Sequence, residues 1–202
     1  MFGEEFAKLI DEKLNEEKLA ASSDHQTKQH FGVIKANSEK SKHLETATIR
    51  VEGLMIDLVN LRNEEYTEDS RVPTICIGTP TEDAYRRDLT INSMFYNINE
   101  EKVEDLTGNG LDDLRNGVLR TPLAPLQTFL DDPIRVLRTI RFANRFEFAI
   151  VPEILAAAKD ASVRECMLNK LSYERLGIEL DKMFEGNLPE LSVAQLHDFD
   201  IL

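Results

Sequence analysis

Apolar residues between positions 129 and 146 recur at the spacing of an α-helix with one buried face. At about 100° per residue, Val136, Leu137, Ile140 and Ala143 fall on one side of this helix. Four arginines fall on the opposite side: Arg135, Arg138, Arg141 and Arg145. Asp132 followed by Pro133 predicts the helix start, because an aspartate can cap free backbone N–H groups and proline suits the first helical position.

The pattern upstream predicts one helix and a group of strands. Residues 4–20 are amphipathic at helical spacing, and the short apolar runs 31–36, 44–51 and 54–61 are typical of strands. Glu52-Gly53 separates the last two runs, which predicts a hairpin. Asp57 interrupts the third run, so it lies either on the exposed face of that strand or as a carboxylate directed into a site.

The rest of the chain changes from mixed to helical character. Residues 63–80 read as a polar connector, 81–96 as a helix, 103–106 as a strand, 107–110 as a turn and 110–117 as a short helix. Further helices are expected at 132–146, about 153–160, 172–185 and 189–197. We therefore expect an α+β fold with two domains, 1–121 and 122–202.

Composition limits the classes of function. The chain of 202 residues carries a formal net charge of −13, so a phosphate ligand requires a local basic patch or a metal ion. Two cysteines, Cys76 and Cys166, without a histidine cluster argue against a disulfide scaffold or a zinc site. No apolar run is long enough to cross a membrane, and no signal peptide is evident. These features predict an intracellular protein without a membrane partner.

The arginine-bearing helix has two interpretations at this stage. Surface helices commonly carry charged faces that are simply solvated. Four arginines without a lysine favour a second interpretation, because the planar guanidinium suits bases and phosphates better than an ammonium group does. The helix is therefore a candidate anion or nucleotide site.

Four ordered segments, taken together, resemble one family. They are RRDLTIN (86–92), Gly110–Arg120, DDPIRVLRTIR (131–141) and LSYERLGIEL (171–180). Their order and spacing strongly resemble the class II tRNA nucleotidyltransferases, the CCA-adding enzymes of the yeast and plant type. The match extends from about Gly3 to about residue 185 and includes GTPTEDAYRRD and TFLDDPIRVLR.

The resemblance implies a fold, an activity and partners. This family adds C, C and A to the tRNA 3′ end from CTP and ATP, with Mg²⁺, in mitochondrial, cytosolic and nuclear tRNA pools. It implies a polymerase-β-type nucleotidyltransferase head, a mixed sheet with helices, followed by an all-helical neck. Because two carboxylates on a strand hold the metal ions in the family, and its Asp-x-Asp would fall upstream of Met1, we expect a fragment that is inactive alone.

The resemblance also implies roles for particular residues. Gly110–Arg120 resembles the flexible connector between head and neck. Nucleotide-binding roles are implied for Arg87, Asp88, Asn92, Asp132, Arg135, Arg138 and Arg141, with Asp88 and Asn92 in the ribose-recognising segment. Glu174 and Arg175 are implied to support the helix that reads the base. No catalytic carboxylate or metal ligand is assigned: Asp57 is at most an auxiliary acid, and Asp198-Phe199-Asp200 follows neither a glycine turn nor a strand.

An Asp–Arg pair has a physical reason to read the base. Cytosine and adenine each present an exocyclic amino donor beside an unprotonated ring nitrogen. The Asp132 carboxylate can accept from the first and Arg135 can donate to the second. Uracil and guanine present the reverse order, and each buried group left unpaired costs roughly 1–3 kcal/mol.

Two alternatives to a CCA-adding function remain open. The chain could be a non-catalytic module that binds a nucleotide or a full-length partner, since a head sheet without a strand exposes an edge. It could also be a poly(A) polymerase of the same superfamily, because related polymerases share signatures similar to DDPIRVLR.

Overall fold

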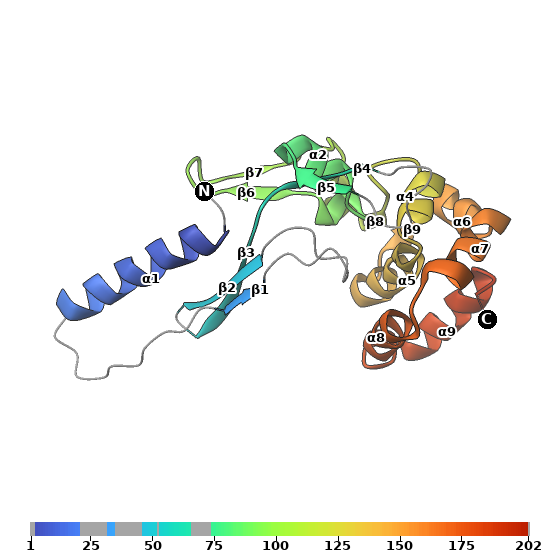
Figure 1. The fold of residues 1–202 in the computed structure, drawn as a ribbon. Coiled ribbons are helices and arrows are strands. Elements are labelled where there is room, and N and C mark those ends of the chain that lie inside the picture. Colours follow the sequence, from blue (N-terminus) through green and yellow to red (C-terminus); the bar gives the residue numbers. More distant parts are fainter. Residues whose placement is uncertain (1–2, 21–31, 35–45, 52, 66–73, 202) are drawn as a thin grey trace. The chain divides into compact units, whose positions relative to one another are not determined.

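The computed structural model describes residues 3–20, 32–34, 46–51, 53–65 and 74–201. The chain divides into two compact units, Met1–Thr79 and Pro80–Leu202, and each is described by itself (Figure 1). No helix in the described part of the chain is both long enough and apolar enough to span a membrane.

In the described residues of unit 1, a helix is followed by a three-stranded antiparallel sheet. Helix α1 spans Gly3–Ala20, and strands β1 (Gly32–Ile34), β2 (Thr46–Val51) and β3 (Leu54–Val59) lie in the order β1-β2-β3. Val51 pairs with Leu54 across the turn, where Gly53 adopts a φ of +83°. The predicted hairpin is therefore confirmed, and Gly53 supplies the left-handed conformation that its turn requires.

The polar connector predicted at 63–80 is wrong. Strands β4 (Arg62–Glu65) and β5 (Thr74–Ile77) form an antiparallel pair there, with Arg62 opposite Ile77 and Glu65 opposite Thr74. The strand β4, with the sequence RNEE, has no alternating apolar residues, so its pattern did not indicate a strand. The pairing with the apolar TICI sequence of β5 overrides this local pattern.

The first part of unit 2 is built from short elements. They are α2 (Pro80–Tyr85), the 3₁₀ turn η2 (Thr90–Asn92), β6 (Phe95–Asn97), β7 (Lys102–Glu104), α3 (Gly110–Asn116) and β8 (Val118–Leu119). The helix predicted over 81–96 is thus wrong beyond Tyr85. The Asp88 Oδ1 accepts from the backbone N–H of Leu89, and the Ser93 hydroxyl donates to the Leu89 carbonyl. These side chains replace helical hydrogen bonds and stabilise a tight turn.

The second part of unit 2 is helical. It comprises α4 (Pro125–Asp131), α5 (Ile134–Phe146), the short strand β9 (Ala149–Ile150), α6 (Pro152–Ala158), α7 (Ala161–Lys170), α8 (Tyr173–Phe184) and α9 (Pro189–Asp198). Helices α4 and α7 were not predicted. β9 pairs in parallel with β8, which joins the helical part to the segment that precedes it. The α+β expectation is confirmed, and the domain seam at residue 121 stays a prediction.

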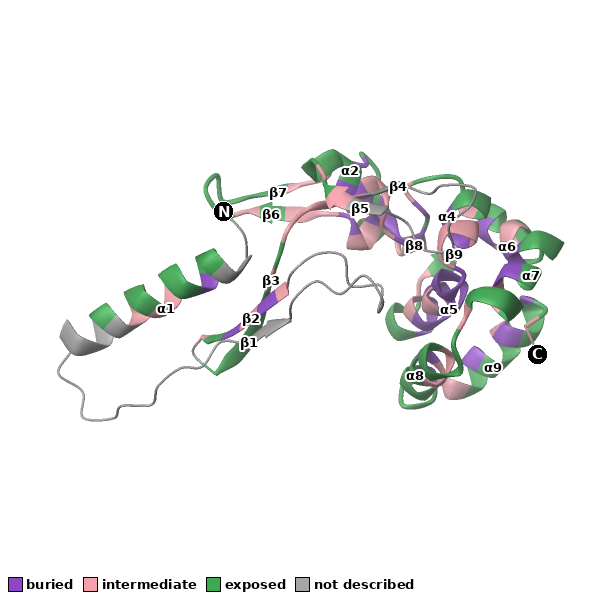
Figure 2. Cartoon of the chain, viewed as in Figure 1, coloured by how far each residue is buried: buried purple, intermediate pink, exposed green. Residues whose placement is uncertain are grey.

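Helix α5 forms the centre of the core of unit 2. Its predicted apolar stripe is buried: Val136, Leu137 and Ile140 are fully inaccessible, and Ala143 is nearly so (Figure 2). Full burial of such an aliphatic side chain contributes roughly 1.5–3 kcal/mol. Residues from α4, α6, α7, α8 and α9 complete the same core cluster, so α5 is held on several sides. The arginines of α5 therefore project from a rigid element.

Candidate functional site

A single buried carboxylate organises the two arginines that follow α2. Asp83 is 2% exposed, and its Oδ1 accepts from Arg86 while its Oδ2 accepts from Arg87. The distances are 2.5 and 2.6 Å, respectively. Arg87 also donates to the Asn92 carbonyl at 2.8 Å and lies 4.6 Å from the centre of the Phe95 ring. Both guanidinium groups are thus fixed in position by the folded chain.

An ion pair joins the RRD segment to α5. Arg138 donates from Nε to the Asp88 Oδ2 at 2.7 Å and from a terminal nitrogen to the same oxygen at 2.6 Å. The other oxygen, Asp88 Oδ1, accepts from the Leu89 N–H and from Asn92 Nδ2. These contacts fix the turn at residues 86–92 beside α5, the helix expected to read the base.

Asp132 and Arg135 lie at the start of α5 with different partners. Arg135 is 9% exposed and donates to the backbone carbonyls of Arg86, at 2.7 Å, and Thr128, at 3.3 Å. The Asp132 Oδ2 accepts from Arg175 of α8 at 2.7 Å. The predicted side-chain cap by Asp132 is wrong: Asp132 follows α4 in an extended conformation, and α5 has no side-chain cap. The backbone carbonyl of Asp132 accepts from the Arg135 N–H instead.

These residues line one cavity of about 330 Å³, which we call the arginine-rich cavity. Its lining contains five arginines and two aspartates, a formal surplus of three positive charges in a chain with a net charge of −13. A cavity of this size suits a small polar ligand, and its charge favours an anion. The lining residues are Arg86, Arg87, Asp88, Asn92, Asp132, Ile134, Arg135, Arg138 and Arg175.

Two residues singled out from the sequence do not line this cavity. Arg141 is 9% exposed, and its Nε donates to Glu179 of α8 at 2.6 Å. Burial raises the pKa of Glu179, but the hydrogen bonds and charges of Arg141 and Lys182 outweigh this effect and lower the pKa below its ordinary value. Glu174 is exposed in the first turn of α8, next to the Arg175 that contacts Asp132.

The segment 105–120 is tied to the turn that carries the RRD sequence. The Thr90 hydroxyl donates to Asp113 at 2.7 Å, Arg120 donates to Asp113 at 3.3 Å, and the Thr90 N–H donates to the Arg120 carbonyl at 2.8 Å. Burial raises the pKa of Asp105, but hydrogen bonds from Leu111 and other neighbours bring it below its ordinary value. The role of a flexible connector for Gly110–Arg120 stays a prediction.

The described residues contain no group of three or more histidine, cysteine or acidic side chains placed to hold a metal ion. Asp57 lies on the exposed face of β3, which is one of the two positions expected for it. Its carboxylate accepts from the Thr48 hydroxyl at 2.7 Å. Asp198 and Asp200 are exposed near the end of the described chain, with Asp200 4.0 Å from Arg164. The side chains present therefore give no basis for deriving a metal-dependent step.

Comparison with known proteins places the chain in a family. The sequence-family model described as the poly A polymerase head domain matches residues 4–120, which is more than half of the chain. The chain therefore belongs to the poly A polymerase head domain family. The predicted resemblance to CCA-adding enzymes is also confirmed by individual relatives, and the polymerase-β-type head followed by a helical region is confirmed with it.

Three relatives illustrate this resemblance. The chain is 50% identical over 194 residues to the mitochondrial CCA tRNA nucleotidyltransferase of Saccharomyces cerevisiae, covering 96% of this chain but 35% of that protein. It is similar to a CCA-adding enzyme in complex with CTP, with 33% identity, a TM-score of 0.64, and coverage of 84% and 36% of the two chains. A Thermotoga maritima CCA-adding enzyme complexed with tRNA matches with 30% identity, a TM-score of 0.63, and coverage of 84% and 37%.

Reasoning from the sequence missed two members of the site, Asp83 and Arg86. A signal for both was present, because Asp83 precedes Arg86 by three residues and Arg87 by four. In a helix, that spacing allows one carboxylate to meet both guanidinium groups. Acids in the first turn also favour a helix start by themselves, so this spacing alone does not identify Asp83 as a partner of the arginines.

Proposed function

We propose that this chain selects CTP and ATP for the addition of CCA to tRNA 3′ ends. One observation carries the proposal: six of the seven residues with implied nucleotide-binding roles line a single positively charged cavity. They come from segments forty or more residues apart, and hydrogen bonds from Arg135 and Arg138 join those segments. Because the chain spans about a third of the length of its curated relatives, the activity of those whole proteins enters here as a proposal.

The base would be read by Asp132 and Arg135. Arg175 engages Asp132 Oδ2, and Oδ1 has no hydrogen bond to another described residue, so it is available to accept from an exocyclic amino group. Two carbonyls orient Arg135 and use two of its five N–H donors, which leaves donors for an unprotonated ring nitrogen. Cytosine and adenine satisfy both groups, whereas uracil presents a carbonyl to Asp132 and an N–H to Arg135.

The remaining cavity residues would hold the sugar and the phosphates. Arg86 and Arg87 are oriented by Asp83 and add positive charge where a triphosphate needs it. Asp88 and Asn92 are proposed to shape the turn that faces the ribose, and Arg138 to fix that turn on α5. Arg141, which does not line the cavity, would act by holding α5 against α8 through Glu179.

The proposed partners and location are based on the similarity to CCA-adding enzymes. The tRNA 3′ end would be the acceptor, as in the tRNA complex of the similar Thermotoga maritima enzyme. Magnesium would serve the transfer step, although the described residues supply no cluster of ligands for it. A mitochondrial location is proposed from the name of the Saccharomyces cerevisiae relative. The cytosol and nucleus stay predictions from the family.

Calorimetry with CTP, ATP and UTP tests the base-reading step on the full chain. We expect CTP and ATP to bind about tenfold more tightly than UTP, because one unpaired buried group costs about 1.4 kcal/mol or more. Arg135→Ala should abolish this preference. Arg115→Ala removes an exposed arginine of α3 that pairs with Asp112, and should leave the preference intact. Equal affinity for the three nucleotides in the unaltered chain would overturn the proposal.

A second candidate, a poly(A) polymerase, is favoured by the description of the matched family. The same titration separates the two functions, because a poly(A) polymerase requires ATP and has no use for CTP. Binding of ATP without CTP would favour that candidate.

A further inference from the structure

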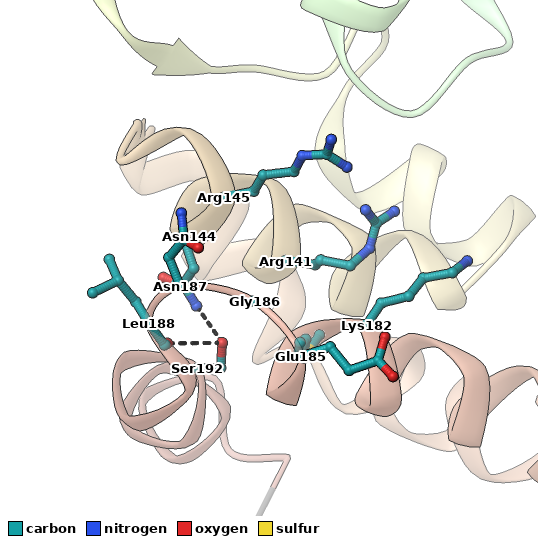
Figure 3. A pocket seen from close by; sticks show the side chains of 10 residues that line it. Arg141, Asn144, Arg145, Lys182, Glu185, Gly186, Asn187, Leu188 and Ser192 are labelled. Carbon is teal, nitrogen blue, oxygen red and sulfur yellow. Dashed lines mark hydrogen bonds between the residues drawn. The ribbon is translucent and has the colours of Figure 1, made fainter.

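A second cavity of about 640 Å³ lies between α5, α8 and the start of α9, and we call it the α5–α8–α9 cavity (Figure 3). It shares no lining residue with the arginine-rich cavity. Three cations line it: Arg141, Arg145 and Lys182. One carboxylate, Glu185, lines it as well. Glu179 pairs with Arg141 and Lys182, so three cations and two carboxylates leave a local excess of one positive charge in an acidic chain.

The helical period of α5 gathers the polar groups of this cavity. Arg141, Asn144 and Arg145 follow the i, i+3, i+4 spacing, which places them on one face. Arg141 uses its Nε on Glu179, and its terminal nitrogens donate to no other described residue. Arg145 is exposed and forms no ion pair within the described chain. In Figure 3 both guanidinium groups and the Lys182 ammonium extend toward the same side of the view.

Asn144 supplies an independent observation that points to a ligand. It is 6% exposed, and its Nδ2 donates to the Ser192 hydroxyl at 2.7 Å. Its Oδ1 is buried and has no hydrogen-bond partner in the described part of the chain. Exchange of the two amide ends would leave the nitrogen unpartnered instead, so the side chain has one unsatisfied polar atom either way. Native proteins satisfy nearly all such atoms, and the exceptions often lie at functional sites.

We propose that the α5–α8–α9 cavity binds a ribose-phosphate unit. The phosphate would be bound by Arg145 and the terminal nitrogens of Arg141, with Lys182 adding charge. A sugar hydroxyl would donate to Asn144 Oδ1, because the unprotonated phosphate oxygens of the same unit have no hydrogen to donate. Glu185 opposes additional negative charge, so the cavity favours one phosphate over a triphosphate. The ribose-phosphate could belong to an RNA strand or to a free nucleotide.

Fluorescence anisotropy on the full chain tests the site with a labelled single-stranded RNA of about ten nucleotides and a DNA of the same sequence. We expect Arg145→Ala and Lys182→Ala each to weaken RNA binding about fivefold. Each change should also reduce the slope of log K against log salt by about 0.7, the value for one phosphate contact on a single strand. Arg115→Ala, the matched loss of an exposed arginine, should change affinity less than about twofold. DNA should bind more weakly than RNA, because it lacks the 2′-hydroxyl.

The proposal is overturned if Arg145→Ala and Arg115→Ala weaken RNA binding equally, or if DNA binds as well as RNA. Displacement of the RNA by cytidine monophosphate, but not by inorganic phosphate, would support the site with a free nucleotide as the source. Displacement by both equally would overturn the ribose-phosphate assignment. Calorimetry with CTP on Arg145→Ala keeps the two proposals separate, because this variant should retain the preference for CTP over UTP. If the unaltered chain shows no preference for CTP over UTP, the proposed function fails, but the proposal for the α5–α8–α9 cavity is unaffected.

Discussion

The Asp88 carboxylate has its acceptor positions filled by its own chain. Its two oxygens accept from the Leu89 N–H, the Asn92 amide and two nitrogens of Arg138, and the residue is 7% exposed. A carboxylate offers about four lone-pair positions, so little capacity remains for a sugar hydroxyl. Asp88 is therefore expected to act by positioning the turn at residues 86–92 on α5, with the fork of Arg138 as its partner.

Arg138→Lys should therefore destabilise the chain although the charge is retained. Lysine lacks the planar fork that makes two contacts with Asp88, and it leaves a buried carboxylate less well satisfied. We expect a loss of about 1–3 kcal/mol in the free energy of unfolding, measured by urea denaturation. Arg115→Ala breaks an exposed pair with Asp112 and should cost less than about 1 kcal/mol. Equal urea midpoints for the two variants would contradict this role.

The pair between Arg141 and Glu179 predicts a defined dependence of stability on pH. The pKa of Glu179 is lowered in the folded chain, since Arg141 and Lys182 outweigh the effect of burial. Its contribution is thus fully present above the pKa in the unfolded state, about 4.3, and is lost as the pH falls through the lower folded value. Glu179→Gln should cost about 3 kcal/mol at pH 7, because it leaves Arg141 with a neutral partner. The difference from the unaltered chain should shrink below about pH 4.

Thermal unfolding at several pH values measures this effect. Glu165→Gln removes an exposed acid of α7 and controls for the general change in charge. A difference between Glu179→Gln and the unaltered chain that stays constant from neutral to acid pH would show that the carboxylate charge is not the source of the stability.

Most residues of the site could be predicted, because they are charged residues in the segments whose order and spacing resemble the CCA-adding enzymes. The sequence could not show which partner each side chain takes. Arg138 and Arg141 follow the same spacing on α5, yet Arg138 meets Asp88 and lines the arginine-rich cavity, whereas Arg141 meets Glu179 and lines the other. Those partners lie 50 and 38 residues away, a separation at which only the tertiary fold decides contact.

At the scale of the elements, two glycines should respond in opposite directions to the same substitution. Gly117 ends α3 with a φ of +65°, and a Cβ there would lie 3.4 Å from the Phe148 ring. Gly177 lies within α8, and a Cβ there would contact nothing within 4 Å. Gly117→Ala should destabilise the chain by about 1–2 kcal/mol, the cost of a left-handed conformation for a residue with a side chain. Gly177→Ala should stabilise it by about 0.5–1 kcal/mol, because alanine is the better helix former.

Urea unfolding of the two alanine variants beside the unaltered chain tests this pair. A loss of stability in Gly177→Ala comparable to that in Gly117→Ala would contradict the prediction that the two substitutions have opposite effects.

Helices and strands could be predicted where local signals decide them. They could not be predicted where side chains form hydrogen bonds with the backbone. Helix α5 and the β2–β3 hairpin were predictable, because the apolar period and the glycine turn are local signals. The helix predicted over 81–96 ends at Tyr85, because side chains of Asp88 and Ser93 take over backbone partners that helical periodicity ignores. Helix α7 was missed because its buried positions, Val163 and Cys166, are too few to form a visible stripe.

At the scale of the molecule, the net charge of −13 makes recognition of phosphates a local property. The described cations that line the two cavities all belong to unit 2, on or beside α5, α8 and the turn at 86–92. Each cavity therefore offers local positive charge in a chain whose net charge is negative. This arrangement favours ligands that fit a cavity over non-specific binding along a polyanion.

A bound nucleotide should stabilise unit 2 and leave unit 1 unchanged. All residues that line the arginine-rich cavity belong to unit 2, and Arg135 and Arg138 link its walls by hydrogen bonds. A ligand that binds only the folded site adds about 2.7 kcal/mol at a concentration of one hundred times its Kd, and this opposes local opening. Hydrogen exchange of the full chain should therefore slow in residues 86–92 and 128–139 on addition of CTP, and should be unchanged in 46–51 and 53–59.

UTP at the same concentration should protect much less, since Asp132 and Arg135 would each face a mismatched group. Protection by CTP that is equal in the two units would indicate binding outside the cavity, and equal protection by CTP and UTP would show that the Asp132–Arg135 pair does not read the base.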